Sequence, residues 1–116
     1  LPAAPGWWSL ISDWAKFVAV FLDPGQSFLS ADSIARLTTP PAGADYALGW
    51  GVLTDPEAGR ILTHAGSNTM WYAQVIAAPE RGTGILVATN CAGDAGPNAV
   101  GAVSKAMRPL LTAAPG

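Results

Sequence analysis

The chain has 116 residues, half of them hydrophobic and 12% charged, with a formal net charge of −2 at pH 7. This length predicts one domain, long enough to bury a core of its own. Without a cluster of Lys or Arg there is little electrostatic basis for binding nucleic acid or an anionic membrane, so we expect neither partner. No apolar run is long enough for a transmembrane helix, and the single cysteine, Cys91, excludes an internal disulfide.

Two helices are predicted in the first third of the chain. Apolar residues recur at helical spacing from Leu10 onward and stop at Asp23-Pro24-Gly25, which predicts a helix over 9–22 with Ser9 as its N-cap. Ser30 is the candidate N-cap of a second helix, predicted over 30–38 and ended by the two prolines that follow.

The middle of the chain predicts four strands, separated by turn signals: residues 48–53, 60–64, 71–78 and 84–90. The fourth is apolar on both faces, which predicts a central position or cover by helices. A last helix is predicted over 98–112, with Asn98 as candidate cap and Pro109 expected to kink or end it. The fold class is therefore α+β: two N-terminal helices, an antiparallel sheet of about four strands, and a C-terminal helix packed on the sheet.

The only histidine in the chain, His64, begins the run His-Ala-Gly-Ser at 64–67. At the mouth of a strand, this pattern can place an imidazole and a free backbone N–H beside one pocket, and the glycine lets a ligand approach the backbone. A lone histidine next to a strand is nevertheless more often a structural residue. A Cys91–His64 dyad is not expected, because the two residues are predicted at opposite ends of separate strands. Trp71 is expected to form a pocket wall.

No paired carboxylates and no metal-ligand spacing are found, so we expect no metal and no cofactor.

Several short runs occur in an order that resembles a known family. They are Gly-Trp-Trp-Ser at 6–9, Asp-Trp-Ala-Lys-Phe at 13–17, Tyr-Ala-Leu-Gly-Trp at 46–50, His-Ala-Gly-Ser at 64–67, Ala-Pro-Glu-Arg at 78–81 and Val-Ala-Thr-Asn at 87–90. Taken in this order, they resemble the C-terminal portion of the penicillin-recognising serine hydrolases. The nearest branch is the one that holds class C β-lactamases, esterases and D-amino-acid peptidases. The His-x-Gly tripeptide alone is a weak signal; its place in this order is much more specific.

The resemblance implies an active site built from three motifs, of which this chain contains one. In the family, Ser-x-x-Lys supplies the nucleophile and Tyr-x-Asn or Ser-x-Asn supplies a second acid/base group, and neither occurs here. The third motif, Lys-Thr-Gly or His-x-Gly, corresponds to 64–66. We therefore expect a C-terminal fragment of a larger β-lactamase/transpeptidase-like fold, inactive by itself, whose partner is the missing N-terminal part that carries the other two motifs.

Carried over residue by residue, the resemblance assigns catalytic roles to His64 and to the backbone N–H of Ser67. His64 would donate a hydrogen bond in the pocket, and the Ser67 N–H would be one oxyanion-hole donor. Substrate-binding roles would fall to Ala65, Gly66, Asn68 and Trp71, with Gly66 leaving room for the substrate. Histidine in place of the family's lysine removes a permanent cation, which favours small esters, amides or peptides over β-lactams. The family's location makes a periplasmic or secreted protein an expectation from resemblance only.

Two alternatives remain open at the level of sequence. The chain can be a non-catalytic module of the same fold that binds peptides or cell-wall material through an edge strand. It can also be a self-contained small α+β domain with a purely structural partner. The fragment hypothesis predicts exposed apolar surface and aggregation, whereas a self-contained domain predicts a soluble, cooperatively folding monomer.

Overall fold

Four antiparallel strands form the centre of the molecule. The computed structural model describes residues 9–23, 25, 28–91 and 93–113. The strands follow one another in space as they do in sequence, in the order β1-β2-β3-β4. Their bounds are Gly51–Asp55 (β1), Gly59–Ser67 (β2), Tyr72–Ala78 (β3) and Thr83–Thr89 (β4). Each connection is a short hairpin, so the sheet is a meander, as the sequence predicts.

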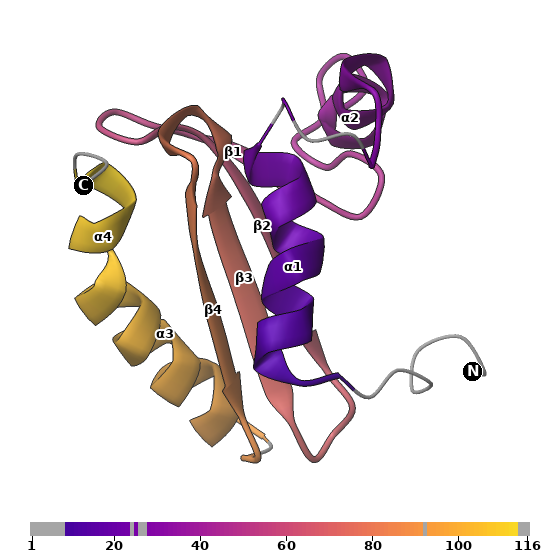
Figure 1. The fold of residues 1–116 in the computed structure, drawn as a ribbon. Helices are drawn as coiled ribbons and strands as arrows, with labels where there is room; N and C mark the ends of the chain where they lie inside the picture. The colour runs from indigo at the N-terminus through magenta and orange to yellow at the C-terminus, as the bar shows by residue number, and fades with distance from the viewer. Residues whose placement is uncertain (1–8, 24, 26–27, 92, 114–116) are drawn as a thin grey trace.

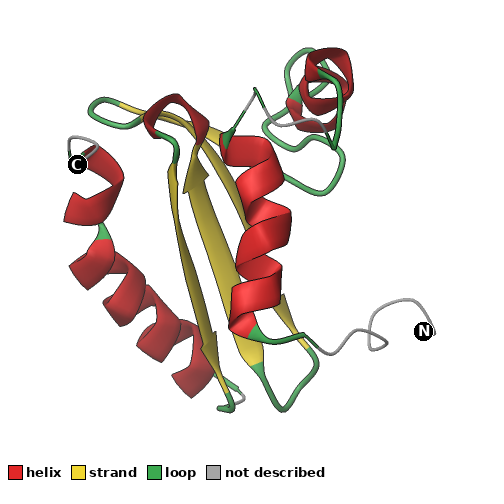
Figure 2. Cartoon of the chain, in the orientation of Figure 1, coloured by secondary structure: helices red, strands yellow, loops and turns green. Residues whose placement is uncertain are grey.

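Helices cover both faces of this sheet. α1 (Ile11–Leu22) and α2 (Ala31–Thr38) precede it, the short 3₁₀ helix η1 (Pro79–Arg81) joins β3 to β4, and α3 (Ala95–Met107) and α4 (Pro109–Thr112) follow. Figure 1 shows α1 on one side of the sheet and α3 with α4 on the other, and Figure 2 shows the resulting helix–sheet–helix layers. The predicted α+β arrangement is therefore confirmed.

Each face of the sheet carries its own hydrophobic core, because successive strand residues point to opposite faces. On the α1 side, Val18 and Phe21 pack with Trp50, Leu62 and Val75. On the α3 and α4 side, the buried residues are Ala58, Ile61, Ala78, Ile85 and Leu111. Leu62 and Ile61 are adjacent in sequence but belong to different cores. The even-numbered side chains of β2 near Leu62 therefore face α1.

The helix starts predicted from capping patterns are partly correct. Ser30 caps α2, since its hydroxyl oxygen accepts a hydrogen bond from Ser33 N at 3.2 Å. The prediction of Ser9 as the cap of α1 is wrong: the helix begins at Ile11 after Leu10, and the Ser9 hydroxyl donates to the Leu10 carbonyl instead. A hydroxyl used as a donor in this way does not satisfy a free N–H of the first turn.

The first strand begins three residues later than predicted, at Gly51 and not at residue 48. Gly49 has a φ of +89°, and Ala47 N donates to Trp50 O at 2.7 Å, so residues 47–50 form a turn. The second strand is longer than predicted. It continues through Ala65, Gly66 and Ser67 because β3 pairs with it up to Tyr72, although these three residues have low strand propensity.

The last predicted helix, over 98–112, is two helices in the structure. α3 begins at Ala95 after Asp94, so the prediction of Asn98 as a cap is wrong. Pro97 lies in the first turn, where the missing N–H costs no intrahelical hydrogen bond. Pro109 ends the first helix and begins α4, as expected of a proline there. α4 brings Leu111 into the core beneath it.

Candidate functional site

The site predicted around His64 lies on a part of β2 that has a neighbour on one side only. β1 pairs with β2 from Asp55 opposite Gly59 to Gly51 opposite Thr63, and the pairing ends there. β3 continues alongside β2 to Ser67, which is opposite Tyr72. The segment His64–Ser67, here called the open segment, is therefore paired with β3 along one edge and has no strand partner among the described residues along the other.

The hydrogen-bonding pattern shows which amides face this open edge. Asn68 N donates to Trp71 O across the hairpin, so residues 68 and 71 form a hydrogen-bonded pair. In an antiparallel ladder such pairs alternate with pairs whose amides point outward. This alternation continues back along the register of β2 and β3. The main-chain N–H and C=O groups of Gly66 and His64 form hydrogen bonds with β3, whereas those of Ser67 and Ala65 point toward the open edge.

The β1 side of the sheet gives the same result independently. Val52 N donates outward to Asp45 O at 2.7 Å, so its pair with Leu62 is not hydrogen-bonded and the pair of Gly51 with Thr63 is. The main-chain N–H and C=O groups of Thr63 therefore point toward β1. Those of residues 65 and 67 point in the same direction, where β1 has already ended. The Ser67 N–H is an outward-facing donor on an exposed stretch of strand.

His64 projects from the open segment on the α1 side, since it alternates with Leu62 of that core. It lines a cavity of about 360 Å³ together with Trp14, Phe17, Phe21, Leu48, Trp50 and Val75. Its Nδ1 lies 3.1 Å from the hydroxyl of Tyr46. Among the described residues that line this cavity, the imidazole is the ionisable side chain, and one of its ring nitrogens is already hydrogen-bonded.

Gly66 is open to approach on the same face. A side-chain carbon built there would meet no heavy atom within 4 Å. The residue is not among the glycines with positive φ, so its backbone does not require glycine. A glycine in a strand interior weakens the strand, and it often marks a place where a ligand or another backbone comes close.

The hairpin after the open segment is held by the side chains of Ser67 and Asn68, two residues predicted to belong to the site, Ser67 through its N–H. Asn68 Oδ1 accepts hydrogen bonds from Met70 N at 3.1 Å and Trp71 N at 2.8 Å. The Ser67 hydroxyl accepts from Thr69 N at 3.1 Å, so the side chain of Ser67 serves the turn and its N–H remains directed outward. The Trp71 side chain is 45% exposed and does not line the cavity beside His64. Substrate contact by Ala65, Asn68 and Trp71 stays a prediction.

Cys91 lies closer to this region than the sequence suggested. Because β2 and β4 both pair antiparallel with β3, Ser67 and Thr89 meet the same residue, Tyr72, at one end of the sheet. The prediction that Cys91 and His64 lie at opposite ends is therefore wrong. They are separated by β3, since strands two places apart are about 10 Å from each other. Cys91 is half-buried.

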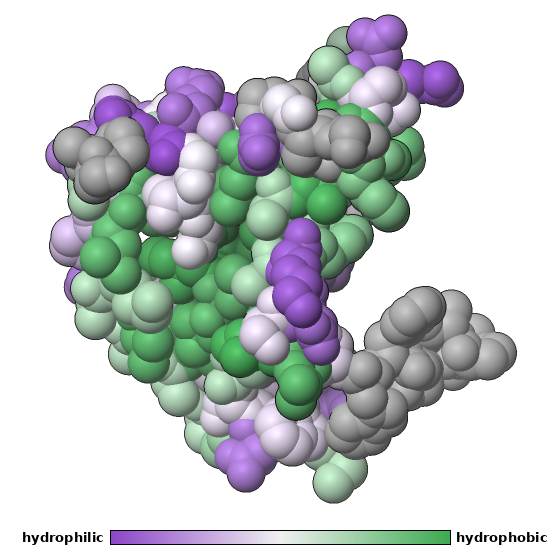
Figure 3. Space-filling view, in the orientation of Figure 1, coloured by the Kyte–Doolittle hydropathy of each residue, from purple (hydrophilic) through white to green (hydrophobic). Residues whose placement is uncertain are grey.

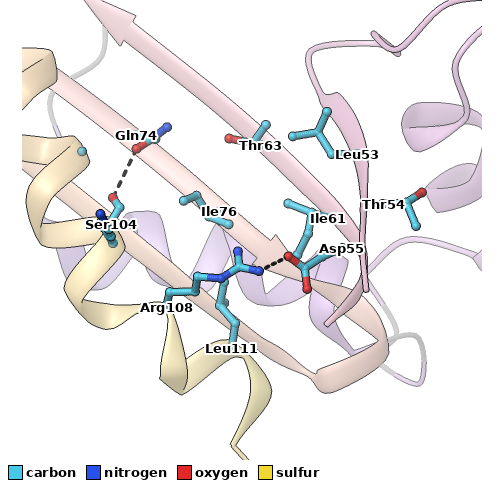
Figure 4. A pocket seen from close by; sticks show the side chains of 12 residues that line it. Leu53, Thr54, Asp55, Ile61, Thr63, Gln74, Ile76, Ser104, Arg108 and Leu111 are labelled. Atoms are coloured by element: carbon cyan, nitrogen blue, oxygen red, sulfur yellow. Dashed lines mark hydrogen bonds and ion pairs between the residues drawn. The ribbon is translucent and has the colours of Figure 1, made fainter. Parts of the chain in front are cut away.

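A second cavity, of about 480 Å³, lies on the opposite face of the sheet against α3 and α4. Figure 4 shows the Ser104 hydroxyl hydrogen-bonded to Gln74 and the Arg108 guanidinium paired with Asp55 across this cavity. Backbone N–H groups of Ala58 and Glu57 and the Arg108 guanidinium lower the pKa of Asp55 from 3.8 to about 2. These contacts tie the turn after β1 to the end of α3, so this group is structural.

Neither a metal centre nor a membrane span is found in the described part of the chain. No group of three or more His, Cys, Asp or Glu side chains is placed to hold a metal ion among residues with described positions. Of the helices that the structure describes, none is long and apolar enough to cross a membrane.

Tyr46 contacts His64 in the structure, and the sequence alone did not predict this contact. It stands 18 positions earlier, in a loop, and no spacing rule connects it to the histidine. The available signal was its place in the run Tyr-Ala-Leu-Gly-Trp, just before a strand that pairs with the histidine's own strand. Antiparallel pairing of those two strands brings the start of β1 to the open segment.

Comparisons with known proteins identify a family over most of the chain. A family model described as Beta-lactamase matches residues 2–106. A search of curated proteins found no match. A search of solved structures found none either.

Proposed function

The chain belongs to the Beta-lactamase family, and we propose that it is the C-terminal part of a serine hydrolase that transfers acyl groups to water. In this proposal, the open segment of β2 forms one wall of the active site. The observation that carries it is the outward direction of the Ser67 N–H on a strand edge that β1 leaves without a partner. That edge also bears the family's third motif, His-Ala-Gly.

The Ser67 N–H supplies one of two oxyanion-hole donors in this mechanism. When a serine attacks an ester or amide carbonyl, negative charge develops on the carbonyl oxygen, and a donor fixed beforehand stabilises it without reorganisation. The second donor comes from the main chain of the nucleophilic serine, which lies outside these residues. Because Ser67 N–H makes no ladder bond to β3, it is available for this role without weakening the sheet.

His64 and Gly66 serve the same edge on its α1 side. The imidazole donates a hydrogen bond to the acyl substrate, and Gly66 leaves the space that the substrate backbone or acyl chain needs. The aromatic and aliphatic lining beside His64 favours an apolar acyl or alcohol group. With no fixed cation at this position, the substrate class is an ester, amide or peptide that is recognised without a carboxylate.

The partner in this proposal is the preceding part of the same hydrolase, which carries Ser-x-x-Lys and Tyr-x-Asn. Two surfaces support it. Large apolar side chains are exposed on and beside α1 and at the β2–β3 hairpin: Leu10, Ile11, Phe17, Phe28, Leu48 and Met70. In addition, β4 is an edge strand without a charged residue, and Figure 3 shows the apolar surface that continues over β4 between α3 and α1. Natural edge strands are usually protected by charge or proline, and β4 has neither.

An esterase assay tests this function. The 116-residue chain alone is expected to leave a chromogenic short-chain ester intact, and the polypeptide that includes the upstream motifs is expected to hydrolyse it. His64→Ala in that longer protein lowers the acylation rate and leaves folding nearly unchanged. Turnover by the chain alone, if a serine-reactive inhibitor blocks it, contradicts the placement of the nucleophile outside these residues. Unchanged kinetics of His64→Ala remove His64 from the site.

A second candidate, a non-catalytic peptide-binding module, is favoured by the same open edge. An extended peptide can add to an unpaired strand edge through main-chain hydrogen bonds, with side-chain pockets on alternate positions. The upstream reading frame distinguishes the two functions. A Ser-x-x-Lys followed by Tyr-x-Asn supports the hydrolase, and the absence of both supports the binding module.

A further inference from the structure

Tyr46 approaches His64 from the loop before β1. Its hydroxyl oxygen lies 3.1 Å from His64 Nδ1, a normal hydrogen-bond distance, and the ring centroids are 6.4 Å apart at an interplanar angle of 48°. The phenol therefore meets the imidazole through its hydroxyl group. This is the one hydrogen bond to a His64 ring nitrogen among the side-chain contacts of the described residues.

Main-chain hydrogen bonds on both sides of Tyr46 fix its backbone position beside the open segment. Asp45 O accepts from Val52 N at 2.7 Å, and Ala47, which is buried, donates its N–H to Trp50 O at 2.7 Å. Tyr46 itself forms an isolated β-bridge with Gly51. With the backbone fixed, only the side-chain torsions of Tyr46 remain to be ordered by the hydrogen bond to His64.

The direction of this hydrogen bond decides where the imidazole carries its proton. A neutral imidazole has one N–H and one acceptor nitrogen, and the hydrogen bond to one nitrogen sets the state of the other. A phenol oxygen shares its lone pair with the ring, which makes the hydroxyl a better donor than acceptor. A Tyr46 hydroxyl that donates to Nδ1 requires the His64 proton on Nε2, at the outer tip of the ring.

We propose that Tyr46 is a positioning residue whose hydroxyl donates to His64 Nδ1 and holds the neutral imidazole with its proton on Nε2. His64 then presents a neutral N–H donor. This consequence rests on the proposed function: such a donor suits the carbonyl or ester oxygen of an uncharged acyl substrate. A substrate carboxylate is held best by a charged donor, which a neutral imidazole does not supply. In this neutral tautomer the pair favours the oxygen of an uncharged ester or amide.

Nitrogen NMR of the imidazole tests the proposal directly, because the chain has one histidine and gives one imidazole spin system. Long-range proton–nitrogen spectra of the ¹⁵N-labelled chain are recorded at about pH 8.5, where an ordinary imidazole is neutral. The unmodified chain is expected to show the tautomer with its proton on Nε2. Tyr46→Phe removes one hydrogen bond and is expected to change the ratio of the two tautomers about fivefold.

Tyr72→Phe is the matched control, since Tyr72 is the only other tyrosine and its Cβ lies 3.0 Å from a side-chain carbon built at Gly96 of α3, on the other face of the sheet from His64. It is expected to leave the imidazole spectrum unchanged. A proton on Nδ1 in the unmodified chain, or an identical tautomer ratio in Tyr46→Phe, overturns the proposal. Loss of dispersed amide signals in Tyr46→Phe also overturns it, because Tyr46 is then a folding residue. None of these results depends on hydrolysis, so a failed esterase assay remains a separate outcome.

Discussion

Gly51 lies opposite Thr63, and this pair is the last one that β1 and β2 share before His64. Because β1 ends at this position, the proposed site lies on a part of β2 with an unpaired edge. One residue further along β2, the strand keeps only β3 as a neighbour, and its outward amides at Ala65 and Ser67 have no strand to bond to within the described chain. Gly49, with its positive φ, turns the chain away before β1 can extend further.

Ser67→Pro is the variant that removes the proposed oxyanion donor. Proline lacks the N–H, and an edge position whose N–H faces away from the ladder tolerates it. In the complete hydrolase, we expect the rate of ester hydrolysis to fall about 100- to 1,000-fold. Ser67→Ala keeps the N–H and loses only the hydroxyl that accepts from Thr69 N, so it is the matched control. Equal rates for the two variants would show that the Ser67 N–H has no role in catalysis.

Gly66→Ala is expected to leave the fold intact or to stabilise it. The new methyl group meets open space, and alanine reduces the entropy of the unfolded chain, which together are worth about 0.5 kcal/mol. Urea unfolding measures this change. The contrasting variant is Gly96→Ala, whose Cβ would lie 2.5 Å from the Cys91 carbonyl oxygen and 3.0 Å from Tyr72 Cβ. It is expected to cost about 1–3 kcal/mol. A destabilising Gly66→Ala would mean that Gly66 is glycine for structural reasons.

Asp55 makes the stability of the fold depend on pH in the acid range. Its pKa is lowered from 3.8 to about 2 in the folded chain, first by the hydrogen bond from Ala58 N and then by Arg108. A carboxyl group with a lowered folded pKa stabilises the protein above its unfolded pKa, and this contribution is lost as the pH falls from about 4 to about 2. Asp55→Asn should therefore flatten the fall in melting temperature over this interval. A variant with the same acid profile as the unmodified chain would contradict this role.

Ala88→Lys tests whether the uncharged edge of β4 makes the isolated chain self-associate. Ala88 is exposed, and a lysine on an edge strand opposes pairing with another chain. Sedimentation velocity over a range of concentrations is expected to show reversible association of the unmodified chain and weaker association of Ala88→Lys. Ala102→Lys, on an exposed position of α3, is the control for added charge. A chain that stays monomeric at all concentrations would favour the self-contained domain over the fragment.

The sequence predicted the layers of the fold better than its local detail. Helical spacing in α1, four strand patterns separated by turn signals and the apolar run within β4 were sufficient to predict an antiparallel sheet covered by helices. The start of β1 was missed because the positive φ of Gly49 is a conformational fact that a Gly-Trp-Gly run does not specify. The start of α3 was missed because Asn98 was the predicted cap, whereas the helix begins before Pro97, which a first helical turn accepts.

The site was predictable only as far as its motif extends. His64, Gly66 and Ser67 are neighbours in sequence, so a single strand keeps them on one segment. Tyr46 could not be placed there, because its contact with His64 depends on the register between β1 and β2 and on a turn of unknown geometry. The outward direction of the Ser67 N–H likewise depends on ladder alternation, which exists only once β3 is paired.

Amide hydrogen exchange across the open segment measures the direction of these N–H groups in the chain itself. The amides of His64 and Gly66, which bond to β3, are expected to be protected, and those of Ala65 and Ser67 are expected to exchange at least tenfold faster, as amides without a ladder bond do. A Ser67 amide as strongly protected as that of Gly66 would mean that it already has a partner, and no oxyanion donor would remain on this strand.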